Sequence, residues 1–219
     1  MTRRETLTRD KVLHAALALV DEEGLDGLSM RRLATALDIQ AMSLYNHVSS
    51  KADILDGIAG HVFEQVQLPG PELAWPEQLR TVALSMYRVF RQHPAVPVAL
   101  ATDQANPTSA QALKPFDALA GALYQAGLDD RRASQALGAV TGLIFGSLLL
   151  STAGLAGRPA GHPDEASTSA YLRQIDAAQL PNLSRLLQGR ATHAAAPAED
   201  FELALDMLIR GLAAEAGQA

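Results

Sequence analysis

The chain has 219 residues, 48% of them hydrophobic, and a formal net charge of -6 at pH 7. This length and hydrophobic content allow a substantial buried core, in one compact unit or in two small domains. Because the chain has no cysteine, a disulfide framework and a thiolate redox switch are both excluded. The opening segment MTRRETLTRDK lacks an apolar core, so we expect no signal peptide.

A first helix is predicted where Leu13, Ala16, Leu17 and Val20 recur at the spacing of one helical face. We expect it to end at Gly24, because glycine can adopt the left-handed conformation that stops a helix. This helix precedes the most informative segment of the chain.

That segment, LSMRRLATALDIQAMSLYNHVSSK at 28–51, is typical of two short amphipathic helices joined by a tight turn at 38–40. Ser29 stands just before the first helix, where its hydroxyl can cap an unpaired backbone N–H. The apolar pattern that includes Leu33 continues after the turn with Leu44, so the two helices are predicted to share one small core.

The second helix of this pair carries hydrogen-bonding side chains opposite its apolar residues: Gln40, Ser43, Asn46 and His47. Amide, hydroxyl and imidazole groups can exchange hydrogen bonds with base edges and phosphates. A plain solvated surface more often carries Lys and Glu. We therefore interpret the pair as a DNA-binding helix-turn-helix.

The net negative charge does not exclude DNA binding, because the electrostatic footprint is local. Four basic residues gather near the start of the chain: Arg3, Arg4, Arg9 and Lys11. We expect them to follow the phosphate backbone as a flexible arm, with an affinity that depends strongly on salt.

A longer fourth helix follows, with Ser50 as its predicted N-cap and Asp53 in its first turn. Its inner stripe consists of Ile54, Leu55, Ile58 and Val62. The sequence QLPGP at 67–71 then interrupts the helical pattern with two prolines around a glycine. We expect two domains, a DNA-binding domain at 1–66 and a helical domain at 67–219.

The chain beyond this boundary keeps helical patterns. An apolar face from Leu79 to His93 indicates a helix that Pro94 stops. A further helix is predicted from about Ser109 to Gln125.

Two later segments are predicted to be flexible loops, GRPAGHPDEAST at 157–168 and GRATHAAAPA at 189–198. No strand pattern is found, so the expected fold is all-α. It comprises an N-terminal three-helix unit containing the helix-turn-helix, a long fourth helix, and a C-terminal helical domain.

The stretch at 133–157 has no charged residue and is long enough to cross a bilayer. Hydroxyl and amide side chains dilute its hydrophobicity, and no aromatic belt flanks it. Gly138, Gly142 and Gly146 form a small-residue ridge that lets two helices approach closely. We favour a buried dimer helix over a membrane anchor.

The residues at 12–58, VLHAALALVDEEGLDGLSMRRLATALDIQAMSLYNHVSSKADILDGI, resemble the TetR family of bacterial repressors, closest to the tetracycline-repressor branch. The match includes the run Leu44, Tyr45, His47 and Val48. The segment DFELALDMLIRGLAAE at 200–215 is similar to the final helix of that branch's C-terminal domain. The resemblance covers the first third of the chain with specific motifs and the remainder loosely.

The resemblance implies contacts with DNA bases or phosphates by nine residues: Arg31, Gln40, Ala41, Met42, Ser43, Tyr45, Asn46, His47 and Lys51. The simpler alternatives are that the ring of Tyr45 packs on the first helix and that Arg31 is a solvated charge. Asp38 occupies a turn position where the family commonly has glycine. Met42 and Asn46 replace a proline and a tryptophan of the tetracycline repressor, so the operator sequence should differ.

The resemblance also implies a homodimer, formed through the helices around 133–153 and 200–215, that binds a near-palindromic operator. Phe201, Leu205, Leu208, Ile209 and Leu212 give the last helix an apolar stripe suited to such pairing. A small hydrophobic effector is expected to release the repressor. The candidate pocket residues are His61, Met86, Tyr87, Phe90, Phe116, Leu119 and Phe145, and plain core packing is the alternative for most of them.

We expect no cofactor and no metal, because no compelling His or carboxylate cluster is apparent. We also expect no enzyme activity, since neither a glycine-rich phosphate loop nor a serine elbow nor spaced metal ligands occur. The predicted protein is cytoplasmic. Two alternatives stay open, a helical adaptor that binds proteins and a membrane-anchored regulator.

Overall fold

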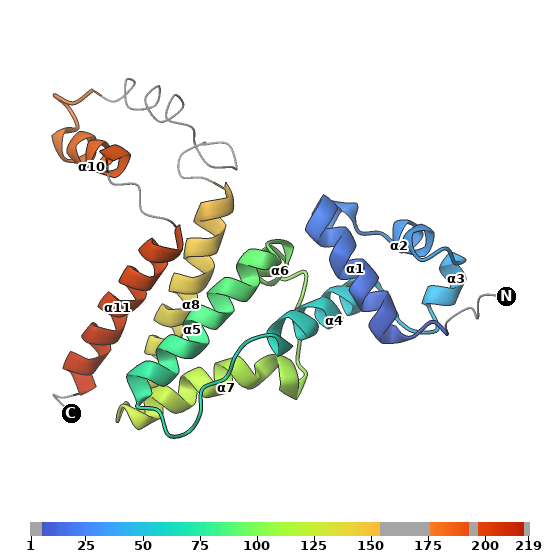
Figure 1. Ribbon diagram of the computed structural model, residues 1–219, viewed down its shortest axis with the longest axis horizontal. Coiled ribbons are helices and arrows are strands. Elements are labelled where there is room, and N and C mark those ends of the chain that lie inside the picture. Colours follow the sequence, from blue (N-terminus) through green and yellow to red (C-terminus); the bar gives the residue numbers. More distant parts are fainter. Residues whose placement is uncertain (1–5, 154–175, 193–196, 217–219) are drawn as a thin grey trace.

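The computed structural model describes residues 6–153, 176–192 and 197–216 (Figure 1). Every regular element in these ranges is a helix, which confirms the predicted all-α fold. The helices are α1 (Arg9–Glu23), η1 (Leu25–Gly27), α2 (Met30–Ala36), α3 (Ala41–Leu44), α4 (Lys51–Glu64), α5 (Trp75–Gln92), α6 (Ala95–Ala101), α7 (Ala110–Gln125), α8 (Asp130–Ala153), α10 (Pro181–Thr192) and α11 (Pro197–Ala216).

Side-chain caps define where the N-terminal helices begin. Ser29 Oγ accepts a hydrogen bond from the backbone N–H of Arg32, and Ser50 Oγ accepts one from that of Asp53. Both predicted caps are therefore confirmed, and Thr8 caps α1 in the same way. Gly24 ends α1 at φ 74 and ψ -179, a conformation beyond the left-handed helical region that glycine alone adopts readily.

The turn between α2 and α3 depends on Asp38, which has φ 53. This is the left-handed region, where the short polar side chain of Asp is tolerated better than most others. The chain thus keeps the turn without the glycine that is common at this position.

Helix α4 connects the N-terminal helices to the rest of the molecule (Figure 1). Its first half packs on α1, where Gly57 leaves no side chain between the helices. A Cβ at Gly57 would lie 2.6 Å and 2.7 Å from the two Cδ atoms of Leu13. Its last turn carries Phe63, which is buried against Phe90 of α5 and Phe116 of α7.

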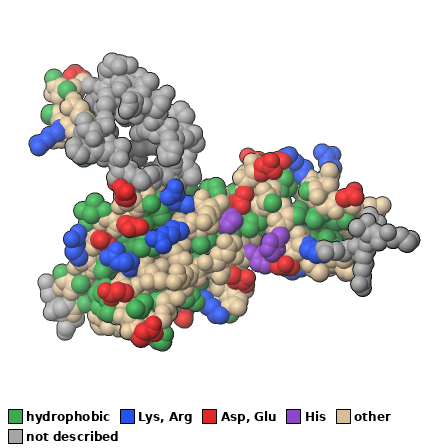
Figure 2. Space-filling view, in the orientation of Figure 1, with side chains coloured by type: hydrophobic (Ala, Val, Ile, Leu, Met, Phe, Trp, Pro, Cys, Tyr) green, Lys and Arg blue, Asp and Glu red, His purple; other side chains and the backbone are tan. Residues whose placement is uncertain are grey.

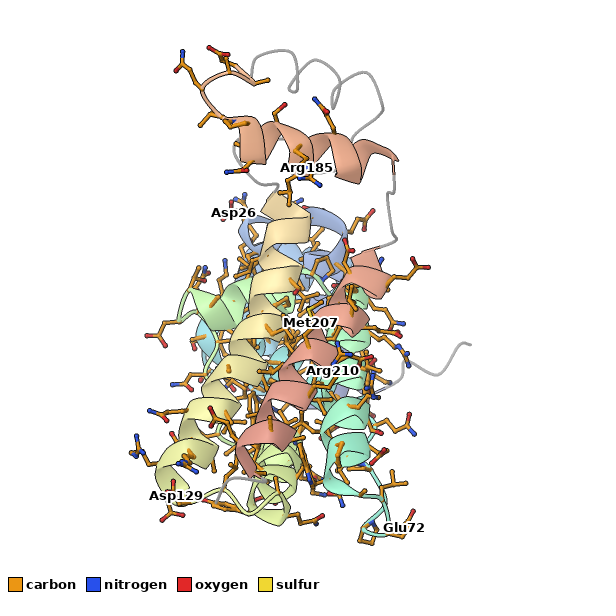
Figure 3. The ribbon with its side chains drawn as sticks, turned by 90° about the vertical axis from the view of Figure 1, so that its left-hand side faces the viewer. Asp26, Glu72, Asp129, Arg185, Met207 and Arg210 are labelled. Atoms are coloured by element: carbon orange, nitrogen blue, oxygen red, sulfur yellow. The ribbon has the colours of Figure 1, made fainter. Side chains whose placement is uncertain are left out.

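The C-terminal helices form the larger part of the core. Helices α5, α7, α8 and α11 pack against one another, and α8 and α11 lie side by side (Figures 1 and 3). Tyr87 of α5 stacks on Phe201 of α11, with ring centroids 4.0 Å apart. Ser109 caps α7, and Gly127 follows the helix with φ 84.

Two helices were not predicted. Helix α6 follows Pro94 directly. Pro94 is its N-cap residue and Pro97 lies in its first turn. At these positions proline removes no helical hydrogen bond, so the helix can form. Helix α10 keeps Leu183 and Leu186 exposed, so it lacks the buried stripe that marks a helix in the sequence.

The loop prediction at 189–198 is wrong for the residues at 189–192, which belong to α10, and for 197–198, which begin α11. The loop predicted at 157–168 lies outside the described residues. Of the uncharged stretch, 133–153 belongs to α8. Among the described helices, none combines the length and the apolar character needed to span a membrane.

Candidate nucleic-acid interface

The surface that follows the Asp38 turn is open to solvent. Leu44 and Val48 are buried in the small core of the N-terminal helices, which turns the intervening side chains outward. Gln40 and Asn46 are exposed, and Ser43 and His47 are half-buried. The predicted polar face is thus accessible to a partner.

Two large side chains extend this surface. Met42 is 75% exposed and Tyr45 is 51% exposed, so neither belongs to the core. About half of the Tyr45 surface is therefore open to a partner, and its ring is not part of the buried core. Ala41 is half-buried beside them. Together they offer apolar and hydroxyl contacts within one short segment.

Helix α3 itself is shorter than the sequence pattern suggests. It ends at Leu44, and residues 45–47 continue as a hydrogen-bonded turn in which the N–H groups of His47 and Val48 donate to the Leu44 carbonyl at 2.8 Å and 3.0 Å. Asn46 and His47 have low helix propensity, and two serines follow before α4. The turn nevertheless keeps Leu44 and Val48 directed inward.

The two arginines of α2 differ in their partners. Arg32 forms an ion pair with Glu23 of α1. Arg31 is exposed, and no ion pair of its guanidinium is found within the described ranges. Arg31 is therefore the one of the two that has its charge available for a phosphate.

Lys51 is the first residue of α4, and its ammonium is engaged inside the chain. Its Nζ donates to the backbone carbonyl of Leu25 at 2.9 Å, and the side chain is half-buried. A phosphate contact by Lys51 would have to share or replace this hydrogen bond. The helix N-terminus beside it also attracts anions.

The predicted basic arm is wrong for Arg9 and Lys11, since both lie in α1. The guanidinium of Arg9 forms an ion pair with Asp53 of α4 and donates to the backbone carbonyl of His47 at 2.9 Å. The hydrogen bond from Arg9 lowers the pKa of Asp53 to about 2. Arg3 and Arg4 lie outside the described residues.

The pocket candidates fall into two places. Met86, Tyr87, Phe90 and Leu119 are fully or almost fully buried in the C-terminal core, and burial raises the pKa of Tyr87. Phe116 and Phe145 are half-buried at its margin.

Four aromatic rings from four helices meet there. Phe90 lies 5.3 Å from Phe63 and 5.5 Å from Phe145, and Phe63 lies 5.4 Å from Phe116, between ring centroids. Phe63 was not among the residues singled out in the sequence. Its ring contacts with Phe90 of α5 and Phe116 of α7 place it in the same cluster as the predicted candidates.

His61 is the exception among the pocket candidates. It faces α1, with its Nε2 3.3 Å from an oxygen of Asp10 and its ring centroid 5.1 Å from that of His14. Helix periodicity explains this, because residues 61 and 63 point to different sides of α4. His61 is therefore placed at the junction with the N-terminal helices.

The apolar stripe predicted for dimer pairing is mostly internal. Phe201, Leu205 and Ile209 are buried inside the chain, because this face of α11 packs on α8 and α5. The outer face of α11 instead exposes Leu203 and Met207. Figure 3 looks onto this side, with Met207 and Arg210 labelled beside α8.

The ridge of α8 is also accessible. Gly138 and Gly142 are exposed and Gly146 is half-buried, and a Cβ at any of them would meet no atom within 4 Å. These backbones can therefore be approached closely by another helix.

Comparison with known proteins identifies two domain families in the chain. Residues 12–58 match the model of bacterial regulatory proteins, tetR family. Residues 68–216 match the tetracyclin repressor-like, C-terminal domain. The second match alone covers more than half of the chain.

Individual relatives support both matches. An HTH-type transcriptional regulator of Saccharopolyspora erythraea is 32% identical over 215 residues, which is 96% of this chain and 86% of that protein. The class D tetracycline repressor protein of Escherichia coli is 32% identical over 168 residues, 73% of this chain and 74% of that protein. The crystal structure of the TetR family protein ActR of Streptomyces coelicolor in complex with actinorhodin superposes with a TM-score of 0.80 at 30% identity, covering 97% of this chain and all of that one.

Proposed function

The chain belongs to the TetR family of bacterial regulatory proteins, and we propose that it is a cytoplasmic, non-enzymatic repressor that binds its operator as a homodimer and is released by an effector. DNA-binding regulation of transcription is the activity of this family. The finer assignments below are proposals for this chain.

The observation that carries the proposal is the exposed surface after the Asp38 turn. Buried Leu44 and Val48 hold this segment against the N-terminal core, while Met42, Tyr45 and Asn46 remain exposed. One face of this segment packs on the core, and the other presents amide, hydroxyl and apolar groups. Such a segment suits the major groove of DNA.

We assign the operator contacts to the nine residues expected from the sequence: Arg31, Gln40, Ala41, Met42, Ser43, Tyr45, Asn46, His47 and Lys51. Arg31 and Tyr45 reach phosphates, and the segment from Gln40 to His47 reads base edges. Ala41 and Met42 provide apolar contact to thymine methyl groups. Lys51 acts only after exchanging the carbonyl of Leu25 for a phosphate.

We propose a domain division at 1–66 and 67–219, supported by the end of α4 at Glu64 and the non-helical segment before α5. Dimerisation uses the outer faces of α8 and α11. Exposed Leu203 and Met207 need an apolar partner, and the glycine ridge of α8 allows close approach. Two recognition segments on a two-fold axis require a near-palindromic operator.

The effector site is proposed near the aromatic cluster of Phe63, Phe90, Phe116 and Phe145. These rings come from α4, α5, α7 and α8, so an occupant here would touch the connecting helix directly. The similar protein ActR binds actinorhodin. For this chain, aromatic walls favour a flat, largely apolar effector.

The test of DNA binding is a selection from random double-stranded DNA, followed by fluorescence anisotropy on the enriched sequence. Unrelated DNA serves as competitor at physiological salt. We expect a near-palindromic sequence bound by two chains with a large preference over the competitor. Absence of any enriched sequence would overturn the proposal and favour a protein-binding adaptor.

The effector assignment has its own test. Calorimetry with a panel of flat aromatic compounds is expected to detect binding by the wild type and weaker binding by Phe116→Ala. Compounds that bind are then added to the protein–DNA complex, where release of DNA is expected. A panel without any binder, or binding that leaves the DNA complex intact, would contradict an effector at this cluster.

A further inference from the structure

Three side chains from two helices meet at the junction of α1 and α4. Asp10 and His14 are one helical turn apart on α1, and His61 reaches them from the last turns of α4. One ligand-type atom from each of the three lies within 4.8 Å of the others. Figure 2 shows histidine side chains gathered on this face, where the N-terminal helices join the rest of the molecule.

The chemistry of the group suits a metal ion better than it suits a simple ion pair. Two imidazoles and one carboxylate are common ligands for Zn²⁺ and neighbouring transition metals. His61 Nε2 is shielded from solvent and has no hydrogen-bond partner among the described atoms, although it lies 3.3 Å from Asp10 Oδ1. A buried nitrogen without a partner is costly unless something binds its lone pair or proton.

The Nδ1 atom of each ring lies near acceptors. His61 Nδ1 lies 3.6 Å from the carboxylate of Glu64. His14 Nδ1 lies 2.9 Å from the backbone carbonyl of Asp10 and 3.4 Å from its carboxylate. When Nδ1 gives its proton to such an acceptor, the lone pair of the ring is on Nε2. Metal-binding histidines are usually oriented by acceptors of this kind.

We propose that Asp10, His14 and His61 form a site for one divalent transition-metal ion, of which Zn²⁺ is the best fit. Three protein ligands leave one tetrahedral position for water. Glu64 does not bind the metal but orients the ring of His61 through Nδ1. The site does not depend on the proposed operator or effector.

The position of the site gives it a structural consequence. Asp10 and His14 belong to the helix that supports the helix-turn-helix, whereas His61 belongs to the connecting helix. A bound ion would therefore clamp α1 to α4. By thermodynamic linkage, any ligand that alters the angle between these helices would change the metal affinity as well.

The test uses the full chain after removal of metals by chelation. Co²⁺ is added as a spectroscopic probe, and its visible absorption reports nitrogen and oxygen coordination. Zn²⁺ binding is measured by calorimetry and by displacement of Co²⁺. We expect one ion per chain, together with a higher melting temperature of the metal-loaded protein.

The variants separate a built site from scattered surface binding. His61→Gln, His14→Gln and Asp10→Asn should each weaken binding by more than about tenfold, and Glu64→Gln by about 10- to 100-fold. His93→Gln is the matched control, because the His93 ring pairs with Asp21 at 2.7 Å and no third ligand-type group joins them among the described residues. This variant should bind Zn²⁺ as the wild type does.

Either of two results would overturn the proposal of a metal site. One is wild-type binding no tighter than that of His61→Gln, and the other is equal loss in His93→Gln. Circular dichroism establishes that each variant is folded. Asp10 is exposed, so Asp10→Asn keeps the test decisive if His61→Gln destabilises the chain.

Discussion

Arg9, the first residue of α1, forms an ion pair with Asp53 in the first turn of α4. The carboxylate of Asp53 also accepts a hydrogen bond from the backbone N–H of Ser49 at 2.7 Å. These contacts join α1, α4 and the segment that follows α3. The pair therefore positions the recognition segment from behind, without being part of its outer surface.

Arg9→Met is expected to lower the free energy of unfolding at neutral pH by roughly 1 kcal/mol, because the pair is partly exposed and screened. The pKa of Asp53 is depressed from 3.8 to about 2 in the folded chain. Its stabilising contribution is therefore complete above 3.8 and is lost as the pH falls towards 2.

Urea denaturation at a series of acidic pH values measures this contribution. The difference in the free energy of unfolding between wild type and Arg9→Met should narrow once the pH falls below the ordinary pKa range of Asp. Arg88→Met removes a more exposed pair with Glu202 and serves as the control, with little effect. A gap that stays constant down to the lowest pH would contradict the assignment to Asp53.

Tyr45→Ala is expected to weaken operator binding by at least about tenfold, or about 1.4 kcal/mol. The reason is that the exposed phenol lies on the proposed DNA surface. Tyr124 on α7 is 53% exposed, close to the 51% of Tyr45, so Tyr124→Ala is a matched control. Anisotropy titrations compare the two variants, and equal losses would count against a direct contact by Tyr45.

Arg31→Ala should reduce the slope of the logarithm of the binding constant against the logarithm of salt concentration by about 1, as for one lost phosphate contact. The adjacent Arg32 is already paired with Glu23, so Arg32→Ala should leave the slope nearly unchanged. Titrations at several salt concentrations measure both slopes. A larger change for Arg32→Ala would reverse the assignment.

Asp38→Gly is expected to stabilise the chain by about 0.5–1 kcal/mol, because glycine adopts the left-handed conformation without steric cost. The φ of Asp38 is 53. Ala18→Gly, at an exposed position inside α1, should do the opposite by a similar amount. Thermal unfolding of both variants tests this, and destabilisation by Asp38→Gly would mean that the carboxylate has a role of its own.

Met207→Asp should convert the proposed dimer to monomers, since it places a charge on the outer face of α11 where an apolar partner is proposed. Light scattering coupled to size exclusion reports the mass. Leu113→Asp, at a 46% exposed position on α7, is the control for adding a charge at an exposed leucine. Dimers that survive Met207→Asp would move the interface elsewhere.

Features that depend on neighbouring residues, such as helix caps and turns, can be predicted from the sequence, whereas contacts between distant residues cannot. Ser29 and Ser50 were identified as caps because capping depends on a hydroxyl three residues before its donor. The tolerance of Asp38 for a left-handed turn is likewise a property of one residue. Periodicity predicts the longer helices that have a buried face, but it does not reveal the seven-residue α6, although α6 also has buried residues.

Hydrophobic periodicity predicts an apolar helix face but does not indicate which other helix covers it. The spacing of Phe201 and Leu205 predicted an apolar face, but only the fold shows that α8 and α5 of the same chain cover it. The contact between His61 and Asp10 could not be predicted, because Asp10 lies 51 positions earlier in the chain. Contacts at such separation depend on how helices cross, which single-helix patterns do not encode.

The close approach of Leu13 to Gly57 packs α1 tightly against α4, so we expect the two helices to move together. The side chain of Leu13 rests directly on the backbone of α4 there, with no second side chain to rearrange between the helices. Tightly packed interfaces deform poorly. If the proposed effector tilts α4 beside Phe63, this packing would pass the tilt to the N-terminal helices as a rigid displacement.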